Sequence, residues 1–301
     1  MAATETISAN YHGLDAWSDE AILGAFSDGQ EKAIAAVRAA HPAIAAAASA
    51  IAARSGARGR LIYVGAGSSG IIAALDGIEL GGTFGWPDDR VVFLLANGTT
   101  LAPGLAGGPE DDVVAGRTAM STLTPGRDDS VIAVAASGTT PFTLAATDVA
   151  RAAGALTVGI ANNRAAPLLA AVDAPIFLDS GAEVIAGSTR MNAGSAQKAA
   201  LNMLSTLTMI RLGHIHDGLM VNLRVENAKL RKRALATIMH IAGCSEGDAL
   251  RALDLAGSRI KPAVLVALGI APAAAERLLA DAGGNLRSVL AKVTERERVT
   301  D

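Results

Sequence analysis

The sequence predicts an α/β protein in which a doubly wound, five-stranded parallel sheet lies between two layers of helices, forming a three-layer sandwich. Between residues 60 and 178, short apolar segments alternate with helical ones. The apolar segments are apolar almost throughout, which is typical of parallel strands buried on both faces. Glycine- and hydroxyl-rich turns follow two of them and lead directly into helices. This order of elements is typical of a parallel sheet covered by helices.

Each element follows from its local pattern. Two Ala-rich helices are expected at the N-terminal end, Ser18–Phe26 and Gln30–Arg54, and Pro42 should bend or break the second. The expected strands are Arg60–Val64, Val91–Ala96, Ser130–Ala135, Leu156–Ile160 and Ala174–Leu178. The helices expected between or after them are Ser69–Leu80, Asp111–Ser121, Pro141–Ala153 and Pro167–Ala171. The helices expected in the tail are Asn222–Thr237, Glu246–Ala256, Pro262–Leu268, Pro272–Ala280 and Asn285–Thr294.

This pattern suggests three parts: an N-terminal helical segment over residues 1–54, the α/β domain over 55–221 and a small helical subdomain over 222–301. The chain has 301 residues, enough for one or two domains. A net charge of -3 without a basic stripe disfavours nucleic-acid binding. We find neither a signal peptide nor an apolar run of the roughly 20 residues that span a bilayer, so we expect a cytoplasmic protein without a membrane partner. A single cysteine, Cys244, excludes an internal disulfide.

The turn after the first strand, from Gly65 to Gly70, matches the G-x-G-x-x-G pattern of dinucleotide-binding proteins. Nicotinamide-binding folds also need an acidic residue at the end of the second strand, to bind the ribose. Here that strand ends in Ala96 and Asn97. The turn instead offers two hydroxyls, Ser68 and Ser69, which such folds do not require. We therefore do not expect a nicotinamide cofactor.

Three polar loops predict an anion site. Since parallel strands end at one edge of the sheet, the loops after the first and third strands should lie side by side. A third loop opens the long apolar helix near residues 191–212, and its helix N–H groups should add to the site. Hydroxyls and helix N-termini can hold a phosphate monoester without a metal ion. Alternatively, the hydroxyls only cap their helices. The residues in question are Gly67, Ser68, Ser69, Ser137, Gly138, Thr139, Thr140, Ser188, Thr189 and Arg190.

Together these motifs resemble the sugar isomerase (SIS) domain, and within it the N-acetylmuramic acid 6-phosphate etherase family, from about Glu31 to Ala282. The specific matches are Gly65–Gly70, Leu75-Asp76, Glu79, Thr83-Phe84-Gly85, Ser137-Gly138, Glu183-Val184 and, above all, Gly187–Gly213. The resemblance implies a phosphosugar site that includes Glu183 and the loop residues above. It also implies a homodimer, with helix 191–212 or the N-terminal helices at the interface, and a UBA-like C-terminal subdomain.

The family cleaves the lactyl ether of N-acetylmuramic acid 6-phosphate to N-acetylglucosamine 6-phosphate and D-lactate. The resemblance implies two catalytic carboxyls, Glu79 as the acid and Glu110 as the base, and no metal or organic cofactor. One carboxylate must accept a proton beside the open-chain aldehyde, while one carboxylic acid protonates the departing lactate oxygen. Neighbouring carboxyls in a dry cleft can have their pKa values driven apart, which assigns these two roles.

Several positions depart from the family pattern. Ile71 replaces an arginine, Thr99 lies where the family has a Gly-Gly-His-Thr loop, and Thr139 replaces an arginine. Gly81-Gly82 replaces paired prolines, and the Arg-Asn-Pro signature is absent from residues 4–15. Cationic partners of an anionic substrate are not exchanged without effect. The substrate therefore stays open between the family substrate and a related phosphosugar. Two other functions also stay open: a non-catalytic phosphosugar-binding regulator and an aldose–ketose isomerase.

A metal site is not expected. His214 and His216 could lie on one face of a strand, but they follow the end of a helix, where histidine interacts favourably with the helix dipole.

Overall fold

The computed structural model describes residues 3–56, 58–100, 104 and 107–300, with side chains up to residue 293. The chain forms two compact units. The first comprises Met1–Ile78 and Asp89–Leu207, and the second comprises Glu79–Asp88 and Thr208–Asp301.

The first unit is built on the predicted five-stranded parallel sheet, with strand order β2-β1-β3-β4-β5. All five strands lie where the sequence predicts them: β1 Leu61–Gly65, β2 Val91–Leu95, β3 Ser130–Val134, β4 Leu156–Ala161 and β5 Ala174–Phe177. In register, Leu61 pairs with Val91 on one side and Ser130 on the other, so β1 lies between β2 and β3. The sheet therefore extends from β1 in both directions, with β2 on one side and β3, β4 and β5 on the other.

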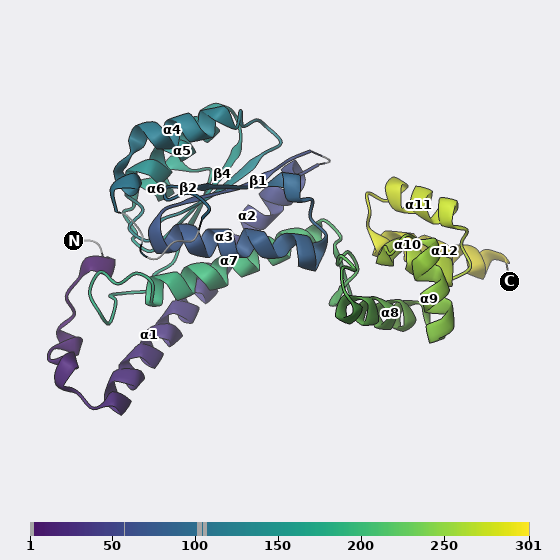
Figure 1. Cartoon of the computed structure of the whole chain (residues 1–301), viewed down its shortest axis with the longest axis horizontal. Helices are drawn as coiled ribbons and strands as arrows, with labels where there is room; N and C mark the ends of the chain where they lie inside the picture. The colour runs from purple at the N-terminus through teal and green to yellow at the C-terminus, as the bar shows by residue number, and fades with distance from the viewer. Residues whose placement is uncertain (1–2, 57, 101–103, 105–106, 301) are drawn as a thin grey trace. The chain divides into compact units, whose positions relative to one another are not determined.

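Helices cover both faces of the sheet, as predicted for a three-layer α/β sandwich (Figure 1). The first layer contains α4 Val113–Thr122, α5 Pro141–Ala152 and α6 Pro167–Ala171. The second contains α2 His41–Arg54, α3 Gly67–Phe84 and α7 Asn192–Arg211. Ile62 of β1 packs in one core with Phe142 of α5. On the opposite face, Tyr63 donates a hydrogen bond of 2.8 Å to the carboxylate of Asp76 in α3, and Ser205 Oγ of α7 donates to it at 3.0 Å.

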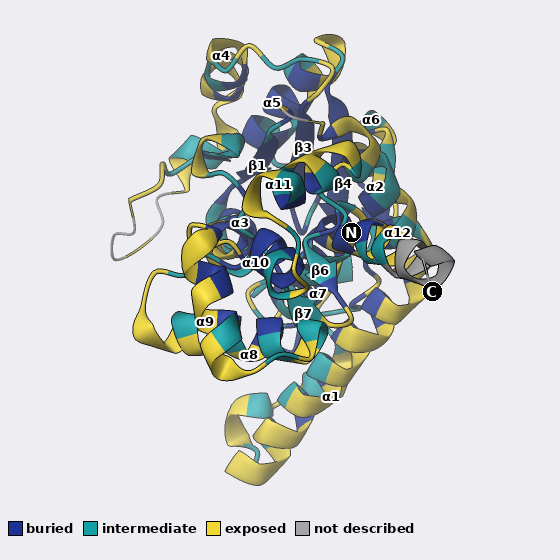
Figure 2. Cartoon of the chain, turned by 90° about the vertical axis from the view of Figure 1, so that its right-hand side faces the viewer, coloured by how far each residue is buried: buried dark blue, intermediate teal, exposed yellow. Residues whose placement is uncertain are grey.

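The N-terminal helices differ from the prediction in one boundary. Helix α1 runs without a break over Asp19–Ala39, and the 56° bend comes at residue 40, with Pro42 in the first turn of α2. The predicted end near Phe26 was wrong because Gly29 lies inside the helix. A Cβ on Gly29 would stand 2.3 Å from Oδ1 of Asn192, so only glycine permits this close approach. Exposed residues dominate the early part of α1 (Figure 2).

Among the described residues, no single helix is both long and apolar enough to cross a membrane. Helices α1 and α2 reach that limit only if the bent pair is counted as one.

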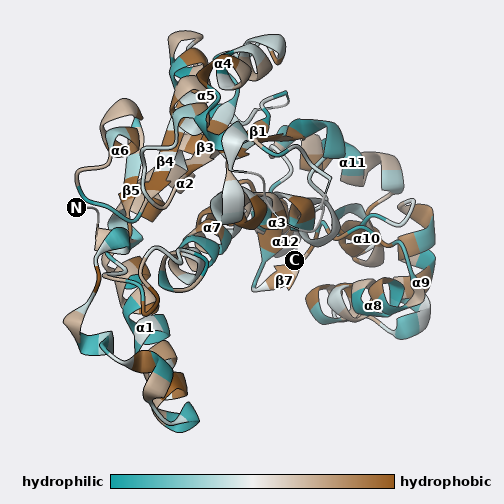
Figure 3. Cartoon of the chain, turned by 60° about the vertical axis from the view of Figure 1, so that its left-hand side comes forward, coloured by the Kyte–Doolittle hydropathy of each residue, from teal (hydrophilic) through white to brown (hydrophobic). Residues whose placement is uncertain are grey.

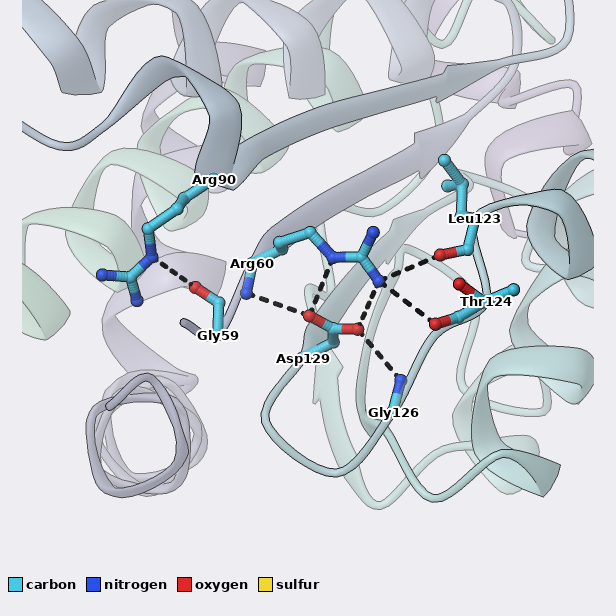
Figure 4. Close-up of polar contacts among 7 residues, drawn as sticks. All are labelled: Gly59, Arg60, Arg90, Leu123, Thr124, Gly126 and Asp129. Atoms are coloured by element: carbon cyan, nitrogen blue, oxygen red, sulfur yellow. Dashed lines mark hydrogen bonds and ion pairs between the residues drawn. The ribbon is translucent and has the colours of Figure 1, made fainter. Parts of the chain in front are cut away.

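At the edge of the sheet where strands begin, an ion pair ties β1 to β3 (Figure 4). Arg60 donates to Asp129 through Nε at 3.0 Å, through Nη2 at 2.7 Å and through its backbone N–H at 3.0 Å. Nη2 also donates to the carbonyl oxygen of Leu123 at 3.0 Å. Burial alone would raise the pKa of Asp129, but hydrogen bonds from Arg60 and Gly126 outweigh it and lower the pKa. The Arg60–Asp129 ion pair, which is largely buried and makes several hydrogen bonds, therefore joins the starts of β1 and β3.

The second unit contains the predicted run of helices around its own core, which includes Ile238, Leu253, Val264 and Leu265. Its helices are α8 Ala228–Ala242, α9 Glu246–Leu255, α10 Ile260–Ala267, α11 Pro272–Asp281 and α12 Leu286–Thr300, and its two short strands are β6 Ile215–His216 and β7 Leu219–Met220. The predicted start of α8 at Asn222 was wrong. The capping residue is Asn227, whose Oδ1 accepts from the backbone N–H of Leu230 at 2.9 Å.

The two histidines that invited a metal interpretation have other surroundings. His214 Nδ1 lies 2.6 Å from the carbonyl oxygen of Phe84 and 2.8 Å from the amide nitrogen of Asn222. His216 is buried and lies beside Asp217. Within the part of the chain that the structure describes, no group of three or more His, Cys, Asp or Glu side chains is arranged to hold a metal ion.

Candidate functional site

A polar cavity of about 320 Å³ opens where β1 and β3 end. This is the point at which the strand order reverses, and ligands of open α/β sheets bind in the crevice there. Polar side chains from all three predicted loops reach the cavity. The hydroxyl residues that line it are Ser68, Ser69, Ser137, Thr140 and Thr189, and the carboxyl residues are Glu5 and Glu110.

The hydroxyls of the cavity are available for a ligand. Among the described residues, the side chains of Ser68, Ser69, Thr140 and Thr189 make no hydrogen bond, so they do not cap their helices. Ser137 Oγ accepts from Thr139, through its backbone N–H at 3.2 Å and its hydroxyl at 3.0 Å. These bonds occupy the acceptor side of Ser137 and leave its own proton free to donate. The capping interpretation is thus not what the structure shows at these positions.

Two helices start at the cavity. Helix α3 begins at Gly67 and α5 begins at Pro141, directly after Thr140. The first N–H groups of a helix have no partner inside it and carry partial positive charge. Since no lysine or arginine is among the described residues that line the cavity, these helix ends and the hydroxyls supply its attraction for an anion. A phosphate ester fits this set of groups.

Glu110 is the predicted catalytic residue that lies in the cavity. The 3-10 helix Gly108–Asp111 presents it. Its Oε1 lies 2.7 Å from the place where a Cβ on Gly67 would stand, and Gly67 has φ +53°, so a side chain there would collide with the carboxylate. Burial, and secondly the charge of Asp111, raise the pKa of Glu110. A carboxyl held in a cleft with a raised pKa is suited to moving protons near neutral pH.

Glu79, the second predicted catalytic residue, lies on α3 and is exposed. It belongs to the second unit and is not among the described residues that line the polar cavity. The structure therefore places Glu110, but not Glu79, among the cavity hydroxyls.

The loop before α7 contributes less than expected. Glu183, which is 1% exposed, accepts hydrogen bonds from the backbone N–H groups of Asn192 and Ala193, both at 2.9 Å. The prediction that the N-terminus of α7 offers free N–H groups was therefore wrong, because Glu183 binds them. Burial raises the pKa of Glu183, and these two bonds oppose that effect.

The remaining predicted residues lie around the cavity without lining it. Arg190 and Thr139 are exposed, Ser188 is partly buried and Gly138 is buried in its turn. Thr139 acts on the cavity through its hydrogen bonds to Ser137.

Sequence reasoning missed Glu5 as a lining residue. The segment around Glu5 has neither helical nor strand periodicity, and its contacts span more than 150 residues of sequence. The Thr-Glu pair at residues 4 and 5 was the available signal, but nothing local connects it to the sheet.

A second, more apolar cavity of about 630 Å³ adjoins the polar one and shares Ala66 and Gly67 with it. Ile71, Leu75 and Ile78 of α3 line it, together with Thr99 after β2. Two positions that depart from the family pattern, Ile71 and Thr99, thus lie in this cavity. The described site offers a polar compartment beside an apolar one.

No protein-family model matches the chain. Three curated relatives named N-acetylmuramic acid 6-phosphate etherase match over nearly their whole length. The relative from Deinococcus radiodurans is 47% identical, covering 95% of this chain and 94% of its own. Those from Cutibacterium acnes and Serratia proteamaculans are 39% and 37% identical, covering 95% and 96% of this chain and 95% and 98% of their own. A solved putative phosphosugar isomerase from Bacteroides fragilis shares 19% identity over 70% of this chain and 96% of its own, with a TM-score of 0.49. That remote likeness says nothing about what the chain binds.

Proposed function

This chain belongs to the N-acetylmuramic acid 6-phosphate etherase family, and we propose that it is the corresponding carbon–oxygen lyase. It would convert N-acetylmuramic acid 6-phosphate to N-acetylglucosamine 6-phosphate and D-lactate, a step of amino-sugar catabolism and peptidoglycan recycling. The observation that carries the proposal is the polar cavity, where free hydroxyls and a carboxyl with a raised pKa meet at the sheet's switch point.

We propose that the phosphate binds among the free hydroxyls at the starts of α3 and α5. Hydroxyl donors and helix N-termini there are suited to phosphate oxygens. The acetyl and lactyl methyl groups would then lie against the apolar cavity, beside Ile71 and Leu75. An arginine at position 71 would place a charge in this apolar cavity, and isoleucine offers methyl groups instead.

In the proposed reaction, Glu110 removes the proton from C2 of the open-chain sugar. The C–O bond at C3 breaks, and a carboxylic acid protonates the lactate oxygen. The family pattern assigns this acid to Glu79, although Glu79 is not among the described residues that line the polar cavity. Water then adds to the resulting unsaturated aldehyde at C3 and completes N-acetylglucosamine 6-phosphate. Each step moves a proton, breaks the ether bond or adds water, and paired carboxyls supply such proton transfers.

The test is incubation of the purified protein with N-acetylmuramic acid 6-phosphate in H₂¹⁸O. We expect D-lactate to be released without label and the sugar product to carry one ¹⁸O at C3, because the ether oxygen leaves with the lactate. Label in the lactate would contradict elimination. Binding without turnover would favour a phosphosugar-binding regulator, and aldose–ketose conversion without lactate would favour an isomerase.

We further propose that the protein acts as a homodimer in the cytoplasm. Leu23 and Ile34 of α1 are 63% and 47% exposed, and Ile34 lines a surface hollow of about 730 Å³. Hydrophobic and hydrophilic residues both occur along α1 (Figure 3). Leu23 and Ile34 are separated by about three helical turns, so they lie on one face of α1, and an exposed apolar face is a candidate interface with another chain. Light scattering should give twice the chain mass of 30.3 kDa. Ile34→Asp should lower that mass and Leu255→Asp, an exposed position in the other unit, should not. A monomeric wild type would refute the dimer.

A further inference from the structure

A short N-terminal segment is fastened beside the polar cavity. The 3-10 turn Ala3–Glu5 carries Thr4, whose side chain is 0% exposed. Thr4 accepts from the backbone N–H of Gly187 at 3.0 Å, and its Oγ1 accepts from Nδ2 of Asn163 at 3.2 Å. The same Nδ2 donates at 2.9 Å to the carbonyl oxygen of Ala136, which lines the cavity. We call residues 3–5 the N-terminal strap.

The strap places Glu5 at the cavity. One carboxylate oxygen lies 3.0 Å from the position of a Cβ on Gly187, and both residues line the cavity. Among the described residues, the Glu5 side chain has no hydrogen-bond or ion-pair partner. A buried anchor thus holds an exposed, unpartnered carboxylate at the edge of a ligand cavity.

The charge of Glu5 limits what it can contact. A carboxylate only accepts hydrogen bonds, and it repels a phosphate dianion. Sugar hydroxyls and an acetamido N–H are donors that suit it, and hydrogen bonds to charged groups are the strong ones. Glu5 therefore belongs beside the sugar, while the phosphate belongs beside the hydroxyls and helix ends of α3 and α5.

Building on the proposed function, we propose that Glu5 is a substrate-binding residue. It accepts hydrogen bonds from the hydroxyl or acetamido donors of the phosphosugar and so fixes which end of the substrate faces the hydroxyl loops. Thr4 is its positioning residue, acting through Gly187 and Asn163. The strap then makes the site selective for a phosphorylated amino sugar over phosphate alone.

Calorimetry with two probes tests this, using N-acetylglucosamine 6-phosphate and inorganic phosphate on the full chain. For Glu5→Gln we expect affinity for the phosphosugar to fall about tenfold, as for one lost charge-assisted hydrogen bond. Affinity for inorganic phosphate should stay the same or increase, because the substitution removes a negative charge that repels phosphate. Glu20→Gln, which removes an exposed carboxylate from α1, should leave both affinities unchanged. Thr4→Val, which keeps the backbone bond but loses Oγ1, should weaken phosphosugar binding by a smaller factor.

Turnover gives a second readout. Glu5→Gln should raise KM about tenfold and leave kcat within about threefold. A fall in kcat of a hundredfold would overturn a binding role in favour of a catalytic one. Equal weakening of both calorimetric probes would indicate a distorted cavity and refute the proposal, as would no change in either. If the wild type bound no phosphosugar, the proposed function itself would be refuted. If the wild type bound it and Glu5→Gln did not change that binding, only the proposed role of Glu5 in the N-terminal strap would be refuted.

Discussion

Glu110→Gln should lower kcat for D-lactate release by about a thousandfold, within the range that a positioned general base supplies. Glutamine keeps the shape of the side chain beside Gly67 but cannot accept the C2 proton. Affinity for N-acetylglucosamine 6-phosphate should stay within about threefold, because the phosphate is assigned to the loop hydroxyls. Stopped assays of lactate together with calorimetry measure both quantities.

The pH profile of the wild type gives an independent check. A base works when ionised, so kcat/KM should rise with pH through the pKa of Glu110. Burial and the charge of Asp111 raise that pKa above its ordinary value of 4.5, and the acid limb should lie correspondingly higher. Asp111→Asn removes the neighbouring charge and should move the limb to lower pH.

Asp128→Asn is the matched control for Asp111→Asn, because it removes one exposed carboxylate near the other edge of the sheet. It should not move the limb. Near-normal turnover by Glu110→Gln would exclude Glu110 as the base, whatever the pH profile shows.

Asp129→Ala should lower the free energy of unfolding by about 3 kcal/mol, the low end of the cost of breaking a buried ion pair. The low end applies because the Arg60 side chain is 26% exposed while Asp129 is 8% exposed. The variant leaves the guanidinium without its carboxylate and the N–H of Gly126 without its acceptor. Urea unfolding measures the difference.

The effect should depend on pH in a defined direction. The pKa of Asp129 is lowered in the folded state, from 3.8, so its stabilising contribution is complete above that value. The contribution disappears as pH falls through the folded-state pKa. The stability difference between wild type and Asp129→Ala should therefore be constant near neutral pH and shrink below about pH 4.

Asp179→Ala serves as the comparison. Asp179 lies 3.8 Å from Arg164, and their side chains are 62% and 81% exposed. Exposed pairs contribute about 0–1 kcal/mol, so this variant should unfold almost as the wild type does. Equal losses in both variants would mean that burial of the Arg60–Asp129 pair carries no special energy.

The strands were predictable because each is a largely apolar segment bounded by turn residues. This is the pattern of β1, β3 and β4, which are buried throughout, and it also holds for the partly buried edge strands β2 and β5. The continuation of α1 was not predictable. Gly29 disfavours a helix locally and is there because Asn192, far along the chain, packs against it.

The candidate site was likewise predictable only in part. Ser68 and Ser137 follow strands directly, so the rule for parallel sheets places them together. The N–H groups at the start of α7 were expected to be free, but they bind Glu183, a contact that forms only when the loop before the helix is folded. Glu5 reaches the cavity only through Thr4 and its distant partners. Where the domain boundaries near residues 54 and 221 lie stays a prediction.

The strap has a consequence for the order in which the protein becomes competent during synthesis. Thr4 leaves the ribosome before its partner Gly187, and almost the whole first unit is made in between. Contacts between such distant residues form late, since the intervening chain must be ordered first. The N-terminal strap thus joins the cavity wall only after Gly187 has been made and the intervening chain has folded. Substrate binding would therefore report that the whole first unit has folded, whereas circular dichroism would already detect its helices and strands.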